Sequence, residues 1–481
     1  MGAGVGGLAA AHRLALLAAE RGSPLDLVVL EASDRAGGVV GTEAHEGALL
    51  ERGPDTLVTH KPAGVELCRR LGLGDRLVHL PAGGIDILHR GRLLPVPAGF
   101  ALLAPTRRWP LLSSPLLGWR GKLRALGEPL VSRGGPAAGD DESVASFVRR
   151  RFGEELLERI VEPIVGAIYM ADVERLSLAA TFPRFLTAER EHGSVAAGLR
   201  QRPPRRTGAA PAEPAAVPVV AALSGGLGQI VSALVARLPE GCLRLRTRVE
   251  RLRRDGQGWA LELADGRSLS AAAVLIAAPA PSAALLLRDL DPELAAPLAA
   301  ISYASCATVH LAWRRPAVAR PPRNLGFFVP RSAGLAPVAG SFVNVKFPTR
   351  APADQVVARL FLGGAARPEV DGRTDAELVE IAAGALAPLL GARGALAWSR
   401  VFRHRRAMPQ LAVGHLALVA RARARLDLHP GLELAGGPVG AYGLPDAIAA
   451  GEAAAARLLE ALDALRAPGS TACDAQRIPR N

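Results

Sequence analysis

The chain is poor in lysine and in aromatic residues. Only three of its 58 basic residues are lysines, Lys61, Lys122 and Lys346, and aromatic residues make up 4% of its 481 positions. Few aromatic side chains leave few platforms on which nucleobases could stack, and no nucleic-acid-binding motif accompanies the net charge of +13. We attribute the arginine excess to codon composition and expect no nucleic-acid partner.

Cysteines and long apolar runs are also scarce. The four cysteines are scattered without the C-x-x-C or cysteine–histidine spacing of a metal site, so we expect isolated thiols in a reducing compartment and no bound metal. No signal peptide and no apolar run of about 18 residues is found. We expect the protein in the cytoplasm, with peripheral contact to the cytoplasmic face of the inner membrane left open.

The sequence begins with a glycine-rich turn. Its residues are Gly2, Gly4, Val5, Gly6 and Gly7, which fit the pattern G-x-G-x-x-G. Such a turn lets the backbone approach a pyrophosphate at the N-terminus of the following helix, expected here over 8–21. The β-strand that should lead into the turn is missing, and we expect it to be encoded upstream of Met1.

An acidic residue and a second glycine pair follow the expected helix. The apolar run 25–30 predicts a strand ending at Glu31, about 20 residues past the turn, where a carboxylate accepts hydrogen bonds from ribose hydroxyls. The pattern E-x-x-x-R-x-G-G then resembles the extension found in FAD-binding, amine-oxidase-like flavoproteins. It contributes the candidate cofactor-binding residues Ala32, Arg35, Gly37 and Gly38. We therefore expect FAD as the cofactor.

Two further glycine-rich turns precede helices, at 224–228 and 436–446. They predict an α/β (α+β multidomain) protein with a Rossmann-like FAD-binding domain built from separated segments, its first strand missing. A sheet-based substrate domain and a helical, membrane-facing subdomain complete it. The expected boundaries are 1–84, 219–285 and 405–465 for the FAD-binding domain, 85–205 for the helical and substrate region, 286–404 for the substrate domain and 466–481 for a disordered tail. A proline-rich linker is expected at 202–218.

The segment 100–133 is apolar, basic and rich in tryptophan, with Trp109 and Trp119 near Arg108, Arg120 and Lys122. This composition suits a membrane interface. It equally suits a helical subdomain whose apolar face is its own core, and both interpretations stay open.

Seven stretches resemble the oxygen-dependent protoporphyrinogen oxidase family and follow each other in the family's order. They are residues 142–153, 161–184, 189–194, 224–234, 346–352, 406–415 and 442–455. The resemblance spans nearly the whole chain and implies an FAD enzyme of porphyrin biosynthesis. Such an enzyme removes six electrons from a porphyrinogen, and dioxygen reoxidises its flavin. On this basis we expect oxidation of protoporphyrinogen IX.

The resemblance also implies roles for individual residues. The first turn would hold the pyrophosphate and Glu31 the ribose, while Val249 would offer backbone contacts to the adenine. The residues expected to close on the pyrophosphate and isoalloxazine are Gly436, Leu444, Pro445 and Asp446. For Asp446, capping the N-terminus of a helix is an alternative or additional role.

The substrate half departs from the family pattern. Gly166 and Ala167 stand where the family places a glycine pair facing the substrate, and Ile85 stands where many members hold a propionate with an arginine. The nearby Arg90 and Arg92 are candidates to replace it, although solvated strand positions are the more ordinary assignment.

Three alternatives remain. The first is oxidation of coproporphyrinogen III to coproporphyrin III on the same fold, whose four propionates call for a more basic pocket. The second is another flavin oxidase or desaturase, although Val439 and Ala441 lack the aromatic pair that an amine oxidase would want. The third is a silent paralogue. Homodimer formation is left open.

Overall fold

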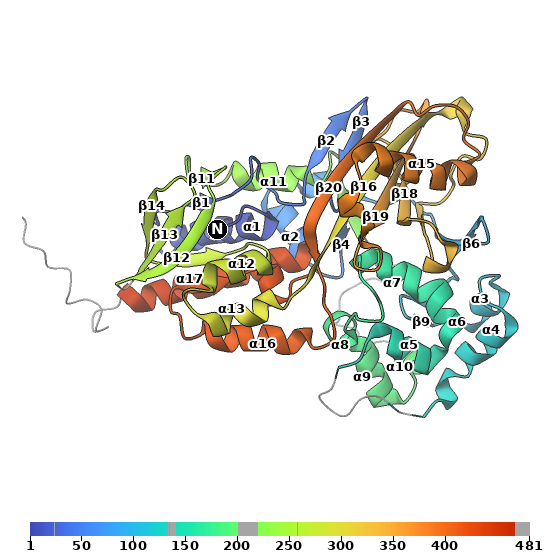
Figure 1. Ribbon diagram of the computed structural model, residues 1–481, viewed down its shortest axis with the longest axis horizontal. Helices are drawn as coiled ribbons and strands as arrows, with labels where there is room; N and C mark the ends of the chain where they lie inside the picture. The colour runs from blue at the N-terminus through green and yellow to red at the C-terminus, as the bar shows by residue number, and fades with distance from the viewer. Residues whose placement is uncertain (24, 133, 135–140, 201–219, 257, 467–481) are drawn as a thin grey trace, which may run out of the picture.

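The computed structural model describes residues 1–23, 25–132, 134, 141–200, 220–256 and 258–466. The expected linker at 202–218 and residues 467–481 of the expected tail lie outside them. One half, called the nucleotide-binding half after the role expected from the sequence, surrounds the long helices α1 (Val5–Glu20) and α17 (Leu444–Arg466). A seven-stranded sheet with a cluster of short helices forms the other half (Figure 1). The mixed helix and sheet fold expected from the sequence is confirmed.

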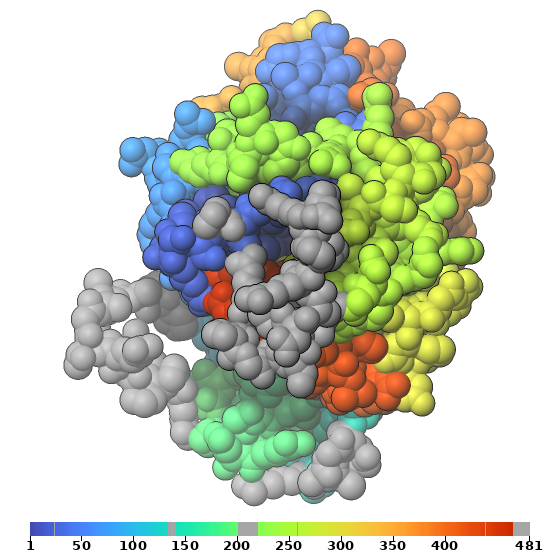
Figure 2. Space-filling model, turned by 90° about the vertical axis from the view of Figure 1, so that its left-hand side faces the viewer, coloured from blue at the N-terminus to red at the C-terminus, as the bar shows by residue number. Residues whose placement is uncertain are grey.

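Two parallel strand pairs form the centre of the nucleotide-binding half. β1 (Val29–Leu30) pairs with β11 (Leu243–Arg244), and β15 (Val274–Ile276) pairs with β21 (Leu432–Leu434). Segments from the beginning, middle and end of the chain therefore meet in one layer. Figure 2 shows such segments, in blue, yellow-green and red, side by side on one face.

The first two residues lie between these pairs. The N-terminal amine of Met1 donates to the carbonyl of Leu275 at 2.7 Å, and the N–H of Gly2 donates to the carbonyl of Leu30 at 2.7 Å. The strand expected over 25–30 is only two residues long. Within the described chain, this strand pairs with two residues of β11 on one side. On its other side it accepts a backbone hydrogen bond from Gly2 alone.

Helices α1 and α17 pack along each other at very short range. A Cβ on Gly451 would overlap the carbonyl oxygen of Gly6, and a Cβ on Gly6 would lie 2.9 Å from the carbonyl oxygen of Ala447. Glycine is needed at both positions because any side chain would force the helices apart. This packing brings the N-terminal ends of the two helices together.

Smaller elements complete this half. Its strands are β2 (Thr42–His45), β3 (Ala48–Glu51), β4 (Leu57–Val58), β5 (Leu77–His79), β10 (Val220–Leu223), β12 (Val249–Asp255), β13 (Gly258–Leu263) and β14 (Ser268–Ala271). Its helices are α2 (Ala63–Arg70), α11 (Gly228–Val235), α12 (Ala280–Leu287), α13 (Pro292–Ala299) and α16 (His415–Leu426).

The other half contains a mixed sheet in the order β20-β16-β19-β18-β17-β6-β7. Its strands are β6 (Ile85–His89), β7 (Arg92–Pro95), β16 (Tyr303–Arg314), β17 (Gly326–Phe328), β18 (Pro337–Phe342), β19 (Gln355–Gly363) and β20 (Trp398–Pro409). β6 runs parallel to β17, and the other neighbours are antiparallel. Helices α14 (Val343–Lys346) and α15 (Asp375–Leu390) belong to this half.

Helix α15 shows why this half folds as it does. Thr374 and Glu377 form a capping box that satisfies free N–H groups at its start. Leu378, Ala382 and Leu386, spaced by four residues, are buried and join the core under the sheet.

Two expected domain boundaries fall elsewhere in the structure. The hairpin β6–β7 opens the region 85–205, expected to be helical and substrate-binding, and it joins the edge of the seven-stranded sheet. Strand β20 runs through the boundary placed at residue 404, and α12 runs through the one placed at 285. A strand or helix is one hydrogen-bonded unit, so the sheet half extends to Pro409.

The helical subdomain packs beneath the sheet (Figure 1). Its elements are β8 (Phe100–Ala101), β9 (Ala104–Pro105), α3 (Arg108–Ser113), α4 (Trp119–Leu126), α5 (Val144–Phe152), α6 (Glu154–Leu156), α7 (Glu162–Tyr169), α8 (Leu178–Thr181), α9 (Pro183–His192) and α10 (Val195–Arg200). A π-helical turn at Leu157–Val161 precedes α7, whose second residue is Pro163. Among the helices described, none is long and apolar enough to cross a membrane.

Candidate active site

The first glycine turn has the geometry of a phosphate-binding turn. Gly2 adopts a φ of +94°, and a Cβ on Gly7 would overlap the carbonyl oxygen of Gly2, so both positions require glycine. A Cβ on Gly4 would meet nothing within 4 Å, so the backbone there faces open space. Helix α1 begins at Val5 and directs its free N–H groups toward that space.

Glu31 is joined directly to this turn. Its Oε2 accepts a hydrogen bond from the N–H of Ala3 at 2.7 Å, and its Oε1 accepts from the N–H and the hydroxyl of Ser33 at 2.9 and 2.7 Å. The N–H of Thr247 donates to the carbonyl of Glu31 at 2.8 Å, which brings the start of β12, at Val249, to the same side. The structure thus gathers the residues assigned to the ribose and adenine.

The segment after Glu31 folds over the turn. The N–H of Gly37 donates to the carbonyl of Ala3 at 2.7 Å, and a Cβ on Gly38 would lie 3.3 Å from the Cα of Gly4. The Arg35 guanidinium donates to carbonyls of its own loop, at 36, 38 and 40, and its pKa is lowered by burial. Arg35 therefore holds the loop in place. Ala32 is exposed beside it.

The third glycine segment meets the first. A Cβ on Gly436 or on Gly443 would find nothing within 4 Å, and α17 begins immediately afterwards. Leu444 is buried, and Pro445 takes the second helical position. Asp446, for which capping was an alternative role, is the third residue of α17 and lies in its first turn rather than at the position before the helix. Its Oδ2 lies 2.6 Å from the Nζ of Lys61.

The site has the features needed to hold FAD. Two helix N-termini and backbone facing open space suit a pyrophosphate, and the Glu31 carboxylate beside them suits a ribose. Contact of each residue with the cofactor stays a prediction. Within the described residues no group of three or more histidine, cysteine, aspartate or glutamate side chains is arranged to bind a metal ion.

Helix α7 approaches the third glycine segment from the helical subdomain. The hydroxyl of Tyr442 donates to the carbonyl of Ile168 at 3.1 Å, and the Tyr442 ring stacks on Tyr169 with 4.6 Å between ring centroids. Burial raises the pKa of Tyr169 to about 12, so its hydroxyl remains protonated at neutral pH. The two rings anchor α7 beside the proposed flavin site.

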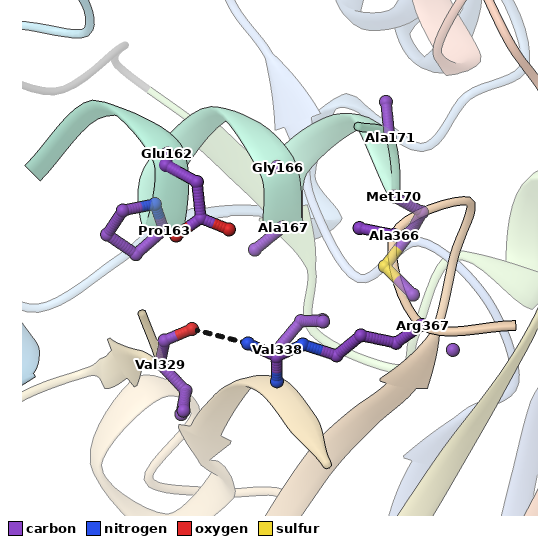
Figure 3. A pocket seen from close by; sticks show the side chains of 11 residues that line it. Glu162, Pro163, Gly166, Ala167, Met170, Ala171, Val329, Val338, Ala366 and Arg367 are labelled. Atoms are coloured by element: carbon purple, nitrogen blue, oxygen red, sulfur yellow. Dashed lines mark hydrogen bonds between the residues drawn. The ribbon is translucent and has the colours of Figure 1, made fainter. Parts of the chain in front are cut away.

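Another face of α7 borders a cavity against the sheet. Gly166 and Ala167, the candidate substrate-facing residues, line it together with Glu162, Met170 and Arg367 (Figure 3). Arg90 and Arg92 do not line it. They are exposed, at the turn and the second strand of the β6–β7 hairpin.

Sequence reasoning missed an ionic cluster between the two halves. Asp55 Oδ2 lies 2.7 Å from Lys346 Nζ and 3.5 Å from the Arg359 guanidinium. Nearby, Glu51 and Arg350 form a buried pair at 3.0 Å. The sequence shows acidic and basic residues within apolar surroundings. It does not show which of them pair, because the partners lie about 300 positions apart in the chain.

Comparison with known proteins shows the family of the chain. The model of the flavin containing amine oxidoreductase family matches residues 5–459. The coproporphyrinogen III oxidase of Propionibacterium freudenreichii subsp. freudenreichii is 35% identical, over 96% of this chain and 90% of the relative. The chloroplastic protoporphyrinogen oxidase of Nicotiana tabacum is 30% identical, over 89% and 78%.

A solved structure extends the likeness to the fold. The crystal structure of a putative protoporphyrinogen oxidase from Exiguobacterium sp. 255-15 matches with a TM-score of 0.82 at 29% identity, over 95% of this chain and 98% of the other. The two glycine turns and the Glu31 carboxylate lie close together, as an FAD site requires. The chain belongs to the flavin containing amine oxidoreductase family and is an FAD-dependent oxidoreductase.

Proposed function

We propose that this protein oxidises coproporphyrinogen III to coproporphyrin III, with dioxygen as the electron acceptor. The observation that carries the proposal is the 35% identity to a relative of that name across almost the full length of both chains. The protoporphyrinogen oxidase of Nicotiana tabacum is less similar and less completely covered. We therefore prefer coproporphyrinogen III to the protoporphyrinogen IX expected from the sequence.

The reaction removes six hydrogens, as six electrons and six protons, from a tetrapyrrole that becomes aromatic. Bound FAD supplies the two-electron acceptor. Passed in pairs to dioxygen, the six electrons and six protons reduce three dioxygen molecules to three hydrogen peroxide molecules. Aromatisation provides the driving force, so the protein's main task is to orient the macrocycle.

The arrangement of α7 supports such a role. One part of the helix is fixed to the third glycine segment through Tyr442, and another face borders the cavity beside the sheet. Its small residues Gly166 and Ala167 leave room next to the backbone. A flat macrocycle lying against α7 outside this small cavity would be oriented by shape rather than by acid–base groups.

The test is an aerobic assay of the purified flavoprotein with freshly reduced porphyrinogens. We expect porphyrin fluorescence to appear, with kcat/KM higher for coproporphyrinogen III than for protoporphyrinogen IX, and three peroxides per porphyrin. A higher kcat/KM for protoporphyrinogen IX would contradict the proposed substrate. No porphyrin from either, by a protein that carries flavin, would contradict the proposed function.

We also propose peripheral contact between the helical subdomain and a membrane surface. Its segment 100–133 exposes the large apolar residues Trp109, Trp119, Leu123 and Leu130, with exposed fractions of 77%, 69%, 65% and 90%. Lys122 lies over the Trp119 ring, with its Nζ 5.1 Å from the centroid. Exposed tryptophans among basic residues are typical of surfaces that bind anionic headgroups.

A further inference from the structure

The cavity beside α7 is small, with room for a polar group or a water molecule rather than for a tetrapyrrole. Glu162, Gly166 and Met170 lie four residues apart and form one wall. Val329 and Val338 from the sheet side form part of the opposite wall.

Two charged side chains reach into this cavity from opposite walls. Figure 3 shows the Glu162 carboxyl and the Ala167 methyl pointing from α7 toward the side of the Arg367 guanidinium, which lies beside Val329. Arg367 comes from the loop after β19. The only carboxyl group among the residues lining the cavity is Glu162.

Arg367 is half-buried, and within the described chain it forms no ion pair. Its guanidinium donates to the carbonyls of Val329, Leu335, Ala336 and Pro337. These contacts fix the group, but neutral carbonyls leave its charge uncompensated. The Nε and one hydrogen of Nη2 make no hydrogen bond to the described residues, so two donors remain for an incoming acceptor.

Glu162 forms no ion pair with Arg367 among the described residues, although the charge of each acts on the pKa of the other. Burial raises its pKa, although the backbone N–H of Arg331, which donates to its Oε2 at 3.1 Å, and the positive charge of Arg367 act in the opposite direction. The Arg331 guanidinium is itself paired with Asp172 at 3.3 Å.

We propose that Arg367, with Glu162 opposite it, binds a propionate of the porphyrinogen that is present in coproporphyrinogen III and replaced by a vinyl group in protoporphyrinogen IX. This inference rests on the proposed function. A carboxylate in the cavity meets an uncompensated guanidinium, whereas a vinyl group would leave that cation desolvated and unpaired. Arg367 therefore selects the substrate with four carboxylates and takes the role for which Arg90 and Arg92 were candidates.

The first test compares Arg367→Gln with the wild type by equilibrium binding of the two porphyrin products, followed by fluorescence. Binding needs no turnover, so it separates this inference from failure of the oxidase reaction. Since hydrogen bonds to charged groups contribute roughly 1.5–3 kcal/mol, we expect Kd for coproporphyrin III to rise about 10-fold or more. Kd for protoporphyrin IX should change less than about 3-fold. KM values for the porphyrinogens should follow the same pattern.

Matched variants serve as controls for the effect of the Arg367 charge. Arg367→Lys retains the charge and should recover part of the affinity, while Arg373→Gln, an exposed arginine paired with Glu377, should change neither Kd. Flavin content and thermal unfolding of each variant show whether the loop held by Arg367 is intact. If Arg367→Gln fails to fold, Ala167→Leu fills the cavity from the other wall and should selectively weaken coproporphyrin III.

The outcomes that overturn the inference are distinct. Equal weakening of both porphyrins would mean that Arg367 binds a carboxylate shared by the two substrates and does not discriminate between them. Unchanged Kd values in folded Arg367→Gln would mean that the cavity binds no propionate. Oxidation of neither porphyrinogen by the wild type, with selective porphyrin binding intact, would instead contradict the proposed function alone.

Discussion

The carboxylate of Asp55 accepts a hydrogen bond from the Nζ of Lys346 at 2.7 Å, and this pair joins the nucleotide-binding half to the seven-stranded sheet half. Arg359 lies 3.5 Å away on β19 and adds a second positive charge. The three residues are largely buried, so their charges interact in a medium that screens them poorly. This contact fixes how the two halves meet beside the cofactor site.

Asp55 should make the stability of the protein sensitive to acid. Burial alone would raise its pKa, but the charges of Lys346 and Arg359 outweigh burial and lower the pKa from 3.8 to about 2. A carboxyl that binds its proton less tightly in the folded state stabilises the fold above about pH 4, and this stabilisation is lost as the pH falls toward 2.

We expect Asp55→Asn to lower the free energy of unfolding at pH 7 by about 3 kcal/mol, because it leaves two buried cations unpaired. The difference from the wild type should shrink as the pH falls from 4 toward 2. Urea unfolding of the flavoprotein at several pH values measures it. Asp265→Asn, in an exposed pair with Arg267, is the control and should unfold like the wild type. If Asp55→Asn lowered the free energy of unfolding by the same amount at every pH, protonation of Asp55 would not be linked to stability.

Glu31 should control the affinity for FAD. The Glu31→Gln variant keeps its size but weakens the acceptor near Ala3 and the expected ribose. We expect the Kd for FAD to rise about 10-fold, which corresponds to the loss of one charged hydrogen bond. Titration of the apoprotein with FAD measures it, with the exposed neighbour variant Asp34→Asn as a control. Equal FAD affinity in Glu31→Gln and the wild type would contradict the ribose assignment.

Substitutions in the glycine turn should separate folding from cofactor binding. Gly4→Ala places a methyl group in the open space expected for the pyrophosphate, at a φ of −64° that alanine adopts readily. The apoprotein should unfold at the wild-type temperature but bind FAD weakly. Gly7→Ala overlaps the Gly2 carbonyl and should destabilise the apoprotein itself. Thermal unfolding and flavin absorbance distinguish the two effects, and normal flavin content in Gly4→Ala would place the pyrophosphate elsewhere.

The exposed tryptophans should govern binding to vesicles. We expect the wild type to sediment with vesicles containing an anionic lipid at low salt, and less with neutral ones, because basic residues attract the headgroups. Replacing Trp109 and Trp119 together by alanine should reduce the bound fraction several-fold. Leu285→Ala, which removes an exposed apolar side chain elsewhere, is the control. If the double variant bound the vesicles as well as the wild type does, these tryptophans would have no role at a membrane.

Local features of the cofactor site follow from the sequence alone. The glycine turn, the helix after it and the acid at Glu31 lie within about 30 residues, so short-range backbone sterics shape this part of the site. The helix at Asp375–Leu390 was likewise predictable from its capping box and four-residue apolar spacing.

The substrate side depended on tertiary structure. Tyr442 meets Ile168, and Glu162 faces Arg367, across 274 and about 200 positions of the sequence. The sequence supplied Arg90 and Arg92 as plausible propionate ligands because they are near Ile85, but the tight β6–β7 turn exposes them.

The sequence by itself therefore determined that the protein binds FAD, because a dinucleotide site is built from short-range backbone geometry. Only the tertiary structure decided which charges meet beside α7 and between the two halves. Those pairings depend on how the buried faces of distant elements pack. The sequence does not distinguish a half-buried arginine from a solvated one, and only the fold shows which residues lie opposite it.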